Sequence, residues 1–188
     1  MKIAFIGSHG VGKTTLCFDL AGRLKRLDLA VDIVKEVARA CPLPINQDTT
    51  LEAQEWILHT QIAEEIAALS RYQVVICDRS VLDNYAYLTV RAGRRPEYDK
   101  LVQTWVATYD GLFKVPILTP PSFDGTRDVS AAFQAEVDRT IDGLVAELSV
   151  PCHRLDPRNR DGWVDAVLAA MKFPATPPQI DLFSARTG

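Results

Sequence analysis

The sequence predicts an α/β fold of three layers, in which helices cover both faces of a mostly parallel sheet of five strands. Two observations support this prediction. Short apolar runs typical of strands alternate along the chain with longer segments whose apolar residues recur at helical spacing. The first strand, residues 2–6, also leads through a glycine-rich turn directly into a helix. Such alternation favours parallel pairing, because each helix returns the chain to the edge of the sheet at which the next strand begins.

Five segments have the composition of strands. They are short runs rich in Val, Ile and other apolar residues, and polar or Gly- and Pro-containing turns bound them. We expect strands over residues 2–6, 29–37, 73–77, 112–118 and 151–155. Pro116 lies within the fourth of them and favours an edge strand or a bulge there, because proline cannot donate a hydrogen bond to a neighbouring strand.

Six segments carry apolar residues at the spacing of an amphipathic helix. We expect helices over residues 13–27, 50–70, 82–91, 98–109, 130–148 and 163–171. Thr49 and Glu52 have the spacing of a capping box at the start of the second helix, and Ser80 and Asp83 have it at the start of the third. Between the fourth strand and the fifth helix, residues 119–127 form a loop that could serve as a short lid.

Bulk properties limit the classes of protein to consider. The chain has 188 residues and is most simply one domain over 1–171, followed by a Pro-containing tail over 172–188. A net charge of −3 gives no general attraction to nucleic acid or to a membrane, and no apolar run is long enough to cross one. The four cysteines form no C-x-x-C pair, which is typical of reduced thiols in a cytoplasmic protein. Whether the chain forms a homodimer stays open.

The most specific signal is the turn after the first strand, Gly7-Ser8-His9-Gly10-Val11-Gly12-Lys13-Thr14. It has the pattern G-x-x-x-x-G-K-T of a phosphate-binding loop, in which glycines let backbone N–H groups surround a phosphate. Lys13 would reach the β- and γ-phosphates, and the Thr14 hydroxyl would ligate Mg²⁺. We therefore expect nucleotide contacts from Gly7, His9, Gly10, Val11, Gly12, Lys13, Thr14 and Thr15.

Charged residues follow the second and third strands at the edge of the sheet where ligands bind in such folds. Asp78 would hold Mg²⁺ or accept a proton from the acceptor, or else it only stabilises a helix N-terminus. Arg79 would hold a phosphate, unless it is a surface arginine. Glu36 would be the general base and Arg39 an anchor for the acceptor; an ordinary surface ion pair explains their three-residue spacing equally well.

Further candidates lie in the loops and turns around this edge. Asp83 is a candidate substrate contact, although its capping-box spacing from Ser80 is the better explanation. Arg127, in the lid-like loop, would reach the γ-phosphate on closure, or is otherwise a solvated loop residue. Arg158 would stack on the nucleotide base. The arginine-rich turn at 91–95 would grip a second phosphate or a nucleic-acid backbone, with a solvated turn favoured.

These residues resemble the small P-loop kinases of the nucleoside and nucleotide kinase group, including the ATPase-like domain of nicotinamide riboside kinases. The resemblance rests on residues 7–14, Glu36 with Arg39, Asp78-Arg79-Ser80 and Arg127. It implies a P-loop NTPase-type fold, with Asp78 and Arg79 beside the acceptor and Glu36 as base. Polynucleotide 5′-hydroxyl kinases are similar in pairing a carboxylate with an arginine three residues later, as Glu36 and Arg39 do. The lid departs from many nucleoside monophosphate kinases, because it lacks their R-x-x-x-R array.

The residues and the resemblance together predict an ATP- and Mg²⁺-dependent phosphotransferase, with either Glu36 or Asp78 as the base. Its acceptor would be a nucleoside, a nucleotide or a related small metabolite. Two alternatives stay open. One is a kinase that acts on DNA or RNA, at a 5′ end or on a modified base. The other is a regulatory NTP-binding switch that has no acceptor.

Overall fold

The computed structural model describes residues 1–45, 49–119 and 130–174. Its strands are β1 (Lys2–Ile6), β2 (Val31–Val34), β3 (Val74–Asp78), β4 (Gly111–Lys114) and β5 (His153–Arg154). They form one sheet with the order β2-β3-β1-β4-β5, and every neighbouring pair is parallel. The predicted α/β fold with five strands is therefore confirmed, and the sheet is wholly parallel in place of mostly parallel. Residues 120–127 of the predicted lid and residues 175–188 of the predicted tail lie outside the described ranges.

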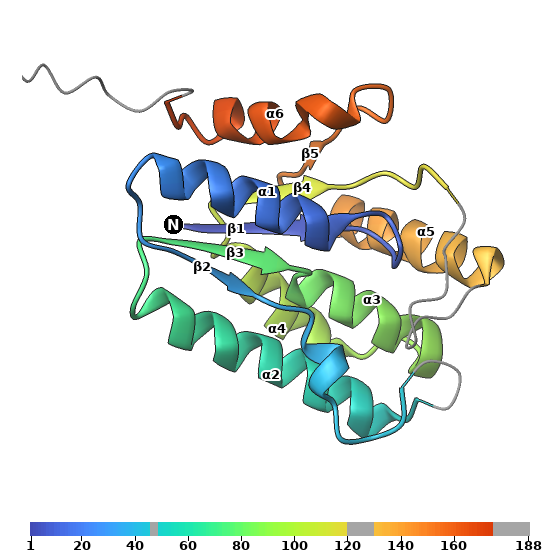
Figure 1. Ribbon diagram of the computed structural model, residues 1–188. Coiled ribbons are helices and arrows are strands. Elements are labelled where there is room, and N and C mark those ends of the chain that lie inside the picture. Colours follow the sequence, from blue (N-terminus) through green and yellow to red (C-terminus); the bar gives the residue numbers. More distant parts are fainter. Residues whose placement is uncertain (46–48, 120–129, 175–188) are drawn as a thin grey trace, which may run out of the picture.

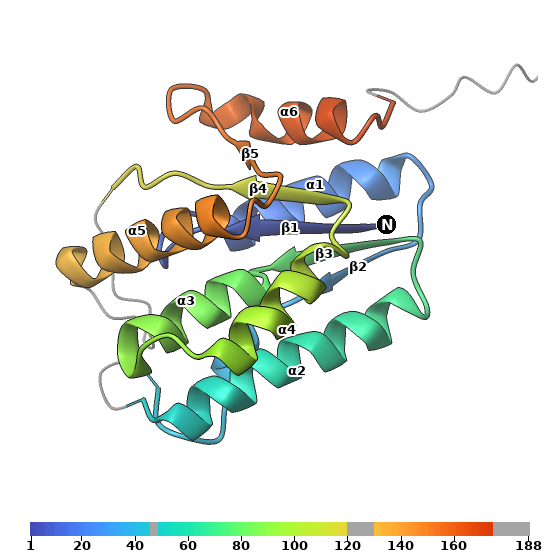
Figure 2. The same ribbon diagram turned by 180° about the vertical axis from the view of Figure 1, so that it is seen from behind.

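Helices cover both faces of the sheet, as Figures 1 and 2 show. They are α1 (Lys13–Arg26), α2 (Leu51–Leu69), α3 (Val81–Ala92), α4 (Pro96–Val106), α5 (Ala131–Glu147) and α6 (Trp163–Ala170). Short 3₁₀ turns, η1 (Val37–Ala40) and η3 (Arg160–Gly162), follow β2 and β5. Helices α1 and α6 lie on one face and the other four on the opposite face, which gives the predicted three layers (Figure 1). No helix in the described part of the chain is long and apolar enough to span a bilayer.

The core consists of two apolar clusters, one on each face of the sheet. In the central strand β1, Ile3 and Phe5 pack towards α1 and α6, whereas Ala4 and Ile6 pack towards the helices of the other face. All five residues of β1 are buried, because a strand in the middle of a covered parallel sheet has no solvent-facing side. This arrangement fixes the carboxyl end of β1, where the glycine-rich turn begins.

Three strands are shorter than predicted. β2 ends at Val34 and not at residue 37, because the chain turns at Glu36 into η1. β4 lies between β1 and β5, so the predicted edge position is wrong; the strand instead ends at Lys114, before Pro116, which cannot donate to the sheet. β5 has only two residues in place of the predicted five. After β2 the early end makes the polar residues Lys35 and Glu36 available to the edge where a site can form.

The two predicted capping boxes have different outcomes. The box at Ser80 and Asp83 is confirmed, with the Ser80 side chain accepting from the Asp83 N–H and the Asp83 side chain accepting from the Ser80 N–H. The box at Thr49 is wrong, since the residue that caps α2 is Thr50, whose hydroxyl accepts from the N–H of Ala53 at 3.3 Å. Thr49 is buried and accepts a hydrogen bond from a side chain inside α2.

Candidate active site

The glycine-rich turn between β1 and α1 has a backbone geometry that glycine allows. Gly7, Gly10 and Gly12 have φ values of 141°, 77° and 94°, which residues with a side chain rarely adopt. A Cβ on Gly7 would also lie 2.7 Å from the carbonyl oxygen of Val115. The first N–H groups of α1 have no side-chain cap, so they can bind an anion. The turn thus has the local structure of a phosphate-binding loop.

Lys13 is folded back onto this loop. Its Nζ donates to the carbonyl oxygens of Gly7 and Ser8, at 2.7 and 2.6 Å. Burial, reinforced by the positive charge of Arg79, lowers the pKa of Lys13 to about 8. A phosphate bound in the loop would favour the charged form of this amine, since an opposite charge within a few ångströms raises the pKa of a lysine.

Thr14 and Asp78 bring two hard oxygen ligands together. The Thr14 hydroxyl donates to Oδ2 of Asp78 at 2.5 Å, from the first turn of α1 to the end of β3. Within the described ranges there is no cluster of three or more His, Cys, Asp or Glu side chains that could enclose a metal. Mg²⁺ needs no such cluster, because it commonly takes one or two protein ligands and completes its shell with phosphate oxygens and water. The Thr14–Asp78 pair fits that role.

Glu36 lies between two arginines. Its Oε1 accepts from Nε and Nη2 of Arg79, at 2.8 and 2.7 Å, and its Oε2 accepts from Nε of Arg39 at 3.0 Å. Its side chain is 13 % exposed and that of Arg79 is 7 % exposed, so the pair with Arg79 is buried, whereas Arg39 is 43 % exposed and its bond to Glu36 lies at the surface. Burial alone would raise the pKa of Glu36, but the charges of Arg79, Lys13 and Arg39 outweigh it and lower the pKa to about 2. Glu36 is therefore a carboxylate at any physiological pH.

Arg79 is one of the most constrained residues of the site. Its backbone has φ of 91°, which is uncommon for a residue other than glycine. Its side chain is 7 % exposed, and the guanidinium carbon lies 4.9 Å from the ring centre of Tyr87. The surface-arginine interpretation of Arg79 is excluded by this burial. The arginine instead joins Glu36 to the aromatic ring.

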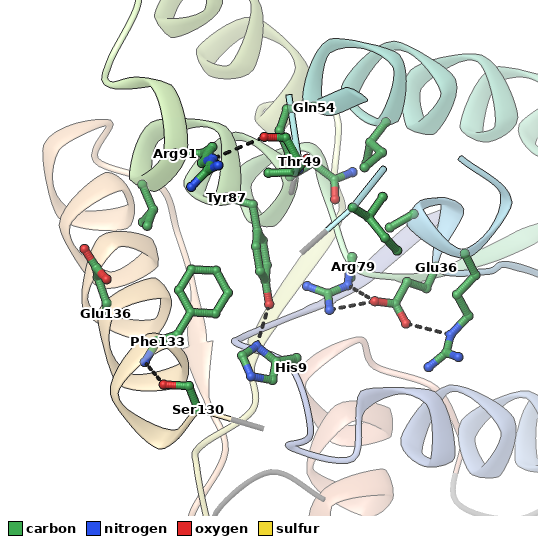
Figure 3. Close-up of a pocket in the computed structure, with 16 residues that line it drawn as sticks. His9, Glu36, Thr49, Gln54, Arg79, Tyr87, Arg91, Ser130, Phe133 and Glu136 are labelled. Atoms are coloured by element: carbon green, nitrogen blue, oxygen red, sulfur yellow. Dashed lines mark hydrogen bonds and ion pairs between the residues drawn. The ribbon is translucent and has the colours of Figure 1, made fainter. Parts of the chain in front are cut away.

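A cavity of about 550 Å³ opens beside Glu36, between η1, α2, α3 and the start of α5 (Figure 3). We call it the Glu36 pocket. Its lining includes His9, Glu36, Arg39, Gln54, Arg79, Asn84, Tyr87, Arg91 and Phe133. The pocket thus connects the glycine-rich turn, through His9, with the charged residues that follow β2 and β3.

One wall of the Glu36 pocket is aromatic. The rings of His9 and Phe133 are stacked with centres 5.8 Å apart, and Tyr87 meets Phe133 edge-on at 6.0 Å. Nδ1 of His9 and the Tyr87 hydroxyl are 3.0 Å apart (Figure 3). The carbonyl oxygen of His9 accepts from Nε2 of Gln134 at 2.8 Å, so α5 is attached to the glycine-rich turn. These contacts place the His9 side chain in the pocket wall.

Two amide side chains give the Glu36 pocket polar groups away from its charged end. Asn84 is 3 % exposed, and its Nδ2 has no hydrogen-bond partner among the described residues. Gln54 is 5 % exposed, and its Nε2 donates to the Thr49 hydroxyl at 2.8 Å. A buried donor without a partner is costly, so Asn84 is suited to bind a ligand with an acceptor group.

Asp83 lies beneath the loop and is completely buried. Its Oδ1 accepts from the N–H of Gly7 at 2.8 Å, and its Oδ2 accepts from the N–H and hydroxyl of Ser80, both at 2.9 Å. Burial raises the pKa of Asp83 despite the opposing charges of Lys13 and Arg79. The capping interpretation therefore holds, and the substrate contact expected from Asp83 has no accessible oxygen to make it.

The remaining candidates are spread over several places. Thr15 is exposed on α1, and Arg127 lies outside the described residues. Arg158 binds its neighbour Asp156 at 3.2 Å with a side chain that is 89 % exposed. Arg160 lies two residues beyond Arg158 in the chain, and its Nη2 is 3.3 Å from the position of a Cβ on Gly12. Of the described arginines after β5, Arg160 is thus the one beside the loop.

The arginine-rich turn at 91–95 does not form a cluster. Arg91 lines the Glu36 pocket and donates from Nε to the carbonyl oxygen of Thr49 at 3.1 Å. Arg94 forms ion pairs with Asp99 and Glu147. Arg95 lies 3.8 Å from a carboxylate oxygen of the residue two positions later. The favoured interpretation, a solvated turn, describes the last two of these arginines.

Sequence reasoning missed most of the pocket wall. Phe133 occupies an apolar position of the helix predicted over 130–148, which equally well indicates core, and no pattern in the sequence marks Gln54, Asn84 or Tyr87. The four come from three helices, and none carries a local motif. One signal was present: Asn84 and Tyr87 lie one and two helical turns beyond Ser80, on the helix that begins at the predicted site.

Comparison with known proteins gives the family. A family model described as an AAA domain matches residues 2–161. The chain belongs to this AAA-domain family. The matched segment of the AAA domain contains the P-loop, both arginine partners of Glu36, and Arg160. No curated protein matches the sequence.

Solved structures similar to this AAA domain include small kinases. A deoxyadenosine kinase from M. mycoides with dCMP and a flexible dCDP bound has a TM-score of 0.67 and 14 % identity, covering 92 % of this chain and 99 % of that one. The same enzyme with dATP has a TM-score of 0.63, with 14 % identity and coverage of 92 % and 100 %. Thymidylate kinase from Ehrlichia chaffeensis has a TM-score of 0.61 and 20 % identity, with coverage of 82 % and 86 %. The fold is that of the small P-loop kinases.

Proposed function

We propose that this AAA-domain protein transfers the γ-phosphate of ATP to a nucleoside, a nucleotide or a related small metabolite bound in the Glu36 pocket. One observation carries the proposal. Glu36, an ionised carboxylate held by Arg79 and Arg39, faces a cavity of about 550 Å³ that borders the P-loop at His9. A switch that only binds an NTP needs no second cavity at the phosphate end, whereas a phosphotransferase needs a place for its acceptor.

The chain's own groups can divide the work of phosphoryl transfer. Lys13 and the first amides of α1 would stabilise charge on the β- and γ-phosphates. Mg²⁺, when bound with ATP, would neutralise further charge, and Thr14 and Asp78 are the residues that would hold it. Arg79 and Arg39 would complete the positive surroundings of the migrating group from the acceptor side.

Glu36 would act on the acceptor. When the acceptor is a hydroxyl, its oxygen forms a bond to the γ-phosphorus while the bond from that phosphorus to the β–γ bridging oxygen breaks, leaving ADP. The hydroxyl proton passes to Glu36. A carboxylate with a pKa of about 2 is a weak base, so the larger part of its contribution is to orient the hydroxyl for in-line attack.

The rest of the Glu36 pocket supports an acceptor with a flat ring. The aromatic wall of His9, Tyr87 and Phe133 offers faces and edges for stacking. The unpartnered Nδ2 of Asn84 can donate to a ring nitrogen or carbonyl. The fold shared with a deoxyadenosine kinase and a thymidylate kinase supports the same class of acceptor. The alternative kinase for DNA or RNA loses support, because Arg94 is paired with carboxylates.

We also propose a cytoplasmic location. Cys17 and Cys77 are buried free thiols, and burial raises the pKa of both well above the ordinary value. Such thiols are unreactive core residues, which is typical of proteins in reducing compartments.

The test is transfer of labelled γ-phosphate from Mg·ATP to a panel of nucleosides, nucleoside monophosphates and vitamin ribosides. We expect at least one acceptor to be phosphorylated, and Glu36→Gln to lower kcat by about 100-fold or more with ATP binding retained. Glu64→Gln, an exposed carboxylate on α2, is the matched control and keeps full activity. The proposal fails if the wild type binds ATP yet transfers phosphate to no member of the panel. Basal ATP hydrolysis that is unchanged in Glu36→Gln would favour the regulatory switch.

A further inference from the structure

A completely buried carboxylate lies on α2, away from the Glu36 pocket. Glu65 and its neighbour one turn earlier, Gln61, both have no exposed surface. The Glu65 carboxylate accepts from Nζ of Lys2 at 2.8 Å, Nε2 of Gln61 at 2.9 Å, Nε1 of Trp105 at 2.7 Å and the Tyr109 hydroxyl at 2.6 Å. Four donors on a buried acid form a rigid centre, since the bonds join α2 to β1, through Lys2, and to α4 and the segment that follows it, through Trp105 and Tyr109.

Two branches lead from this centre to the turn after β3. Gln61 Nε2 carries a second hydrogen, which it donates to the carbonyl oxygen of Arg79 at 3.4 Å. The Tyr109 hydroxyl, which donates to Glu65, accepts from the N–H of Val81 at 3.2 Å. Glu65 therefore holds the backbone on both sides of Ser80.

The segment held in this way is the one that needs support. Arg79 has φ of 91°, a conformation that costs free energy and persists only where its surroundings fix it. The guanidinium of the same residue donates to Oε1 of Glu36, from Nε at 2.8 Å and from Nη2 at 2.7 Å. If the hydrogen bond to the Arg79 carbonyl oxygen were lost, φ of Arg79 could relax to a negative value, and the guanidinium would no longer point towards Glu36.

We propose that Gln61 and Tyr109, anchored on Glu65, are positioning residues that fix the backbone of Arg79 and so aim its guanidinium at Glu36. None of the three lines the Glu36 pocket. Their catalytic consequence rests on the proposed phosphotransfer function, whereas their effect on Arg79 does not. The inference therefore needs one measurement with turnover and one without.

Gln61→Met is the first variant, because methionine keeps the length of the side chain and removes both N–H donors. We expect kcat to fall by about 10- to 100-fold, since a displacement of about 1 Å can cost that much, with KM for ATP within about twofold of the wild type. Tyr109→Phe removes the hydroxyl and with it the bonds to Glu65 and Val81, but it leaves the bond from Gln61 to Arg79, so it should lower kcat by less. Glu65 is left intact, because its loss would leave the buried Lys2 without a counter-charge.

Val167→Ala is the matched control for stability. Val167 has no exposed surface and packs in the cluster of the opposite face, on α6. The variant should unfold at a lower temperature, as Gln61→Met does, and keep the wild-type kcat. Equal losses of kcat in both variants would mean that Gln61 acts only through stability, and the inference would be wrong.

The measurement without turnover is the titration of the Glu36 carboxylate by ¹³C NMR, with Glu36→Gln to assign the signal. The charged groups around Glu36 are Arg79, Arg39 and Lys13, and they keep it ionised. In Gln61→Met and Tyr109→Phe the midpoint should rise by about one pH unit or more, because Arg79 no longer faces the carboxylate. A midpoint equal to that of the wild type in both variants overturns the inference. Failure of phosphate transfer in the wild type would instead overturn the proposed function. The titration would then still show whether Gln61 fixes the position of Arg79.

Discussion

Glu36→Gln has a predictable effect on stability as well as on activity. The substitution keeps the shape of the side chain but removes the charge between Arg79 and Arg39. The surroundings lower the pKa of Glu36 from 4.5 to about 2, and each unit corresponds to about 1.4 kcal/mol, so the ionised form stabilises the fold by about 3 kcal/mol. We expect the variant to lose about that much of the free energy of unfolding at pH 7.

The sign of the pH dependence follows from the direction of this shift. Because the pKa of Glu36 is lower in the folded state, its ionised carboxylate stabilises the fold fully at pH values above the unfolded pKa of 4.5. This stabilisation disappears as the pH falls towards the folded pKa of about 2. Urea denaturation of wild type and Glu36→Gln at pH 7, 4.5 and 3 should therefore show a difference that shrinks as the solution becomes more acidic. Glu64→Gln, on the exposed face of α2, should show no comparable difference. Equal stabilities of wild type and Glu36→Gln at pH 7, or a difference independent of pH, would refute the reasoning.

Three further predictions concern the loop and the pocket. Burial lowers the pKa of Lys13 to about 8, so above that pH the protein should take up a proton when it binds ATP, and its affinity for ATP should fall. Calorimetry in buffers of different ionisation enthalpy measures this proton uptake, which Lys13→Met should abolish. Gly7→Ala should destabilise the fold by about 2 kcal/mol or more, because residue 7 has a φ of 141° and the new Cβ would lie 2.7 Å from the Val115 carbonyl oxygen. Gly22→Ala places its Cβ with no atom within 4 Å and should stabilise the fold by about 0.5–1 kcal/mol. Thermal denaturation compares the two variants. Phe133→Ala should raise KM for the acceptor about tenfold and leave KM for ATP unchanged, and an equal rise in both would contradict its place in the pocket wall.

The sequence predicted those parts of the fold that depend on local pattern. The strand–turn–helix at residues 2–27 follows from an apolar run, three glycines and a helical stripe, all within one segment. The start of α3 was predicted for the same reason, because the hydrogen bonds of its capping box join Ser80 and Asp83, which are three residues apart. At α2, two adjacent threonines made the register ambiguous, and the neighbour of the predicted residue is the cap.

The pocket could not be predicted in the same way, because its residues meet only through tertiary packing. Phe133 lies within an apolar stripe that equally well predicts core, and its contact with His9 joins residues more than 120 positions apart. The charged end was accessible to reasoning, since strand ends of a parallel sheet meet at one edge. That rule predicted that Glu36 and Arg79 lie at this edge, but it did not predict the ion pair between them.

The carboxylate of Asp83 has a consequence for attempts to redesign this protein. It joins Gly7 of the P-loop to Ser80, the N-cap of the helix that carries Asn84 and Tyr87. A substitution at the start of that helix would therefore alter the nucleotide loop together with the acceptor wall. Two turns further along the same helix, the Tyr87 hydroxyl also contacts the loop, at 3.0 Å from Nδ1 of His9. Changes intended to alter acceptor choice alone therefore belong on α2, at Gln54, whose amide lines the Glu36 pocket and donates to Thr49 outside the loop.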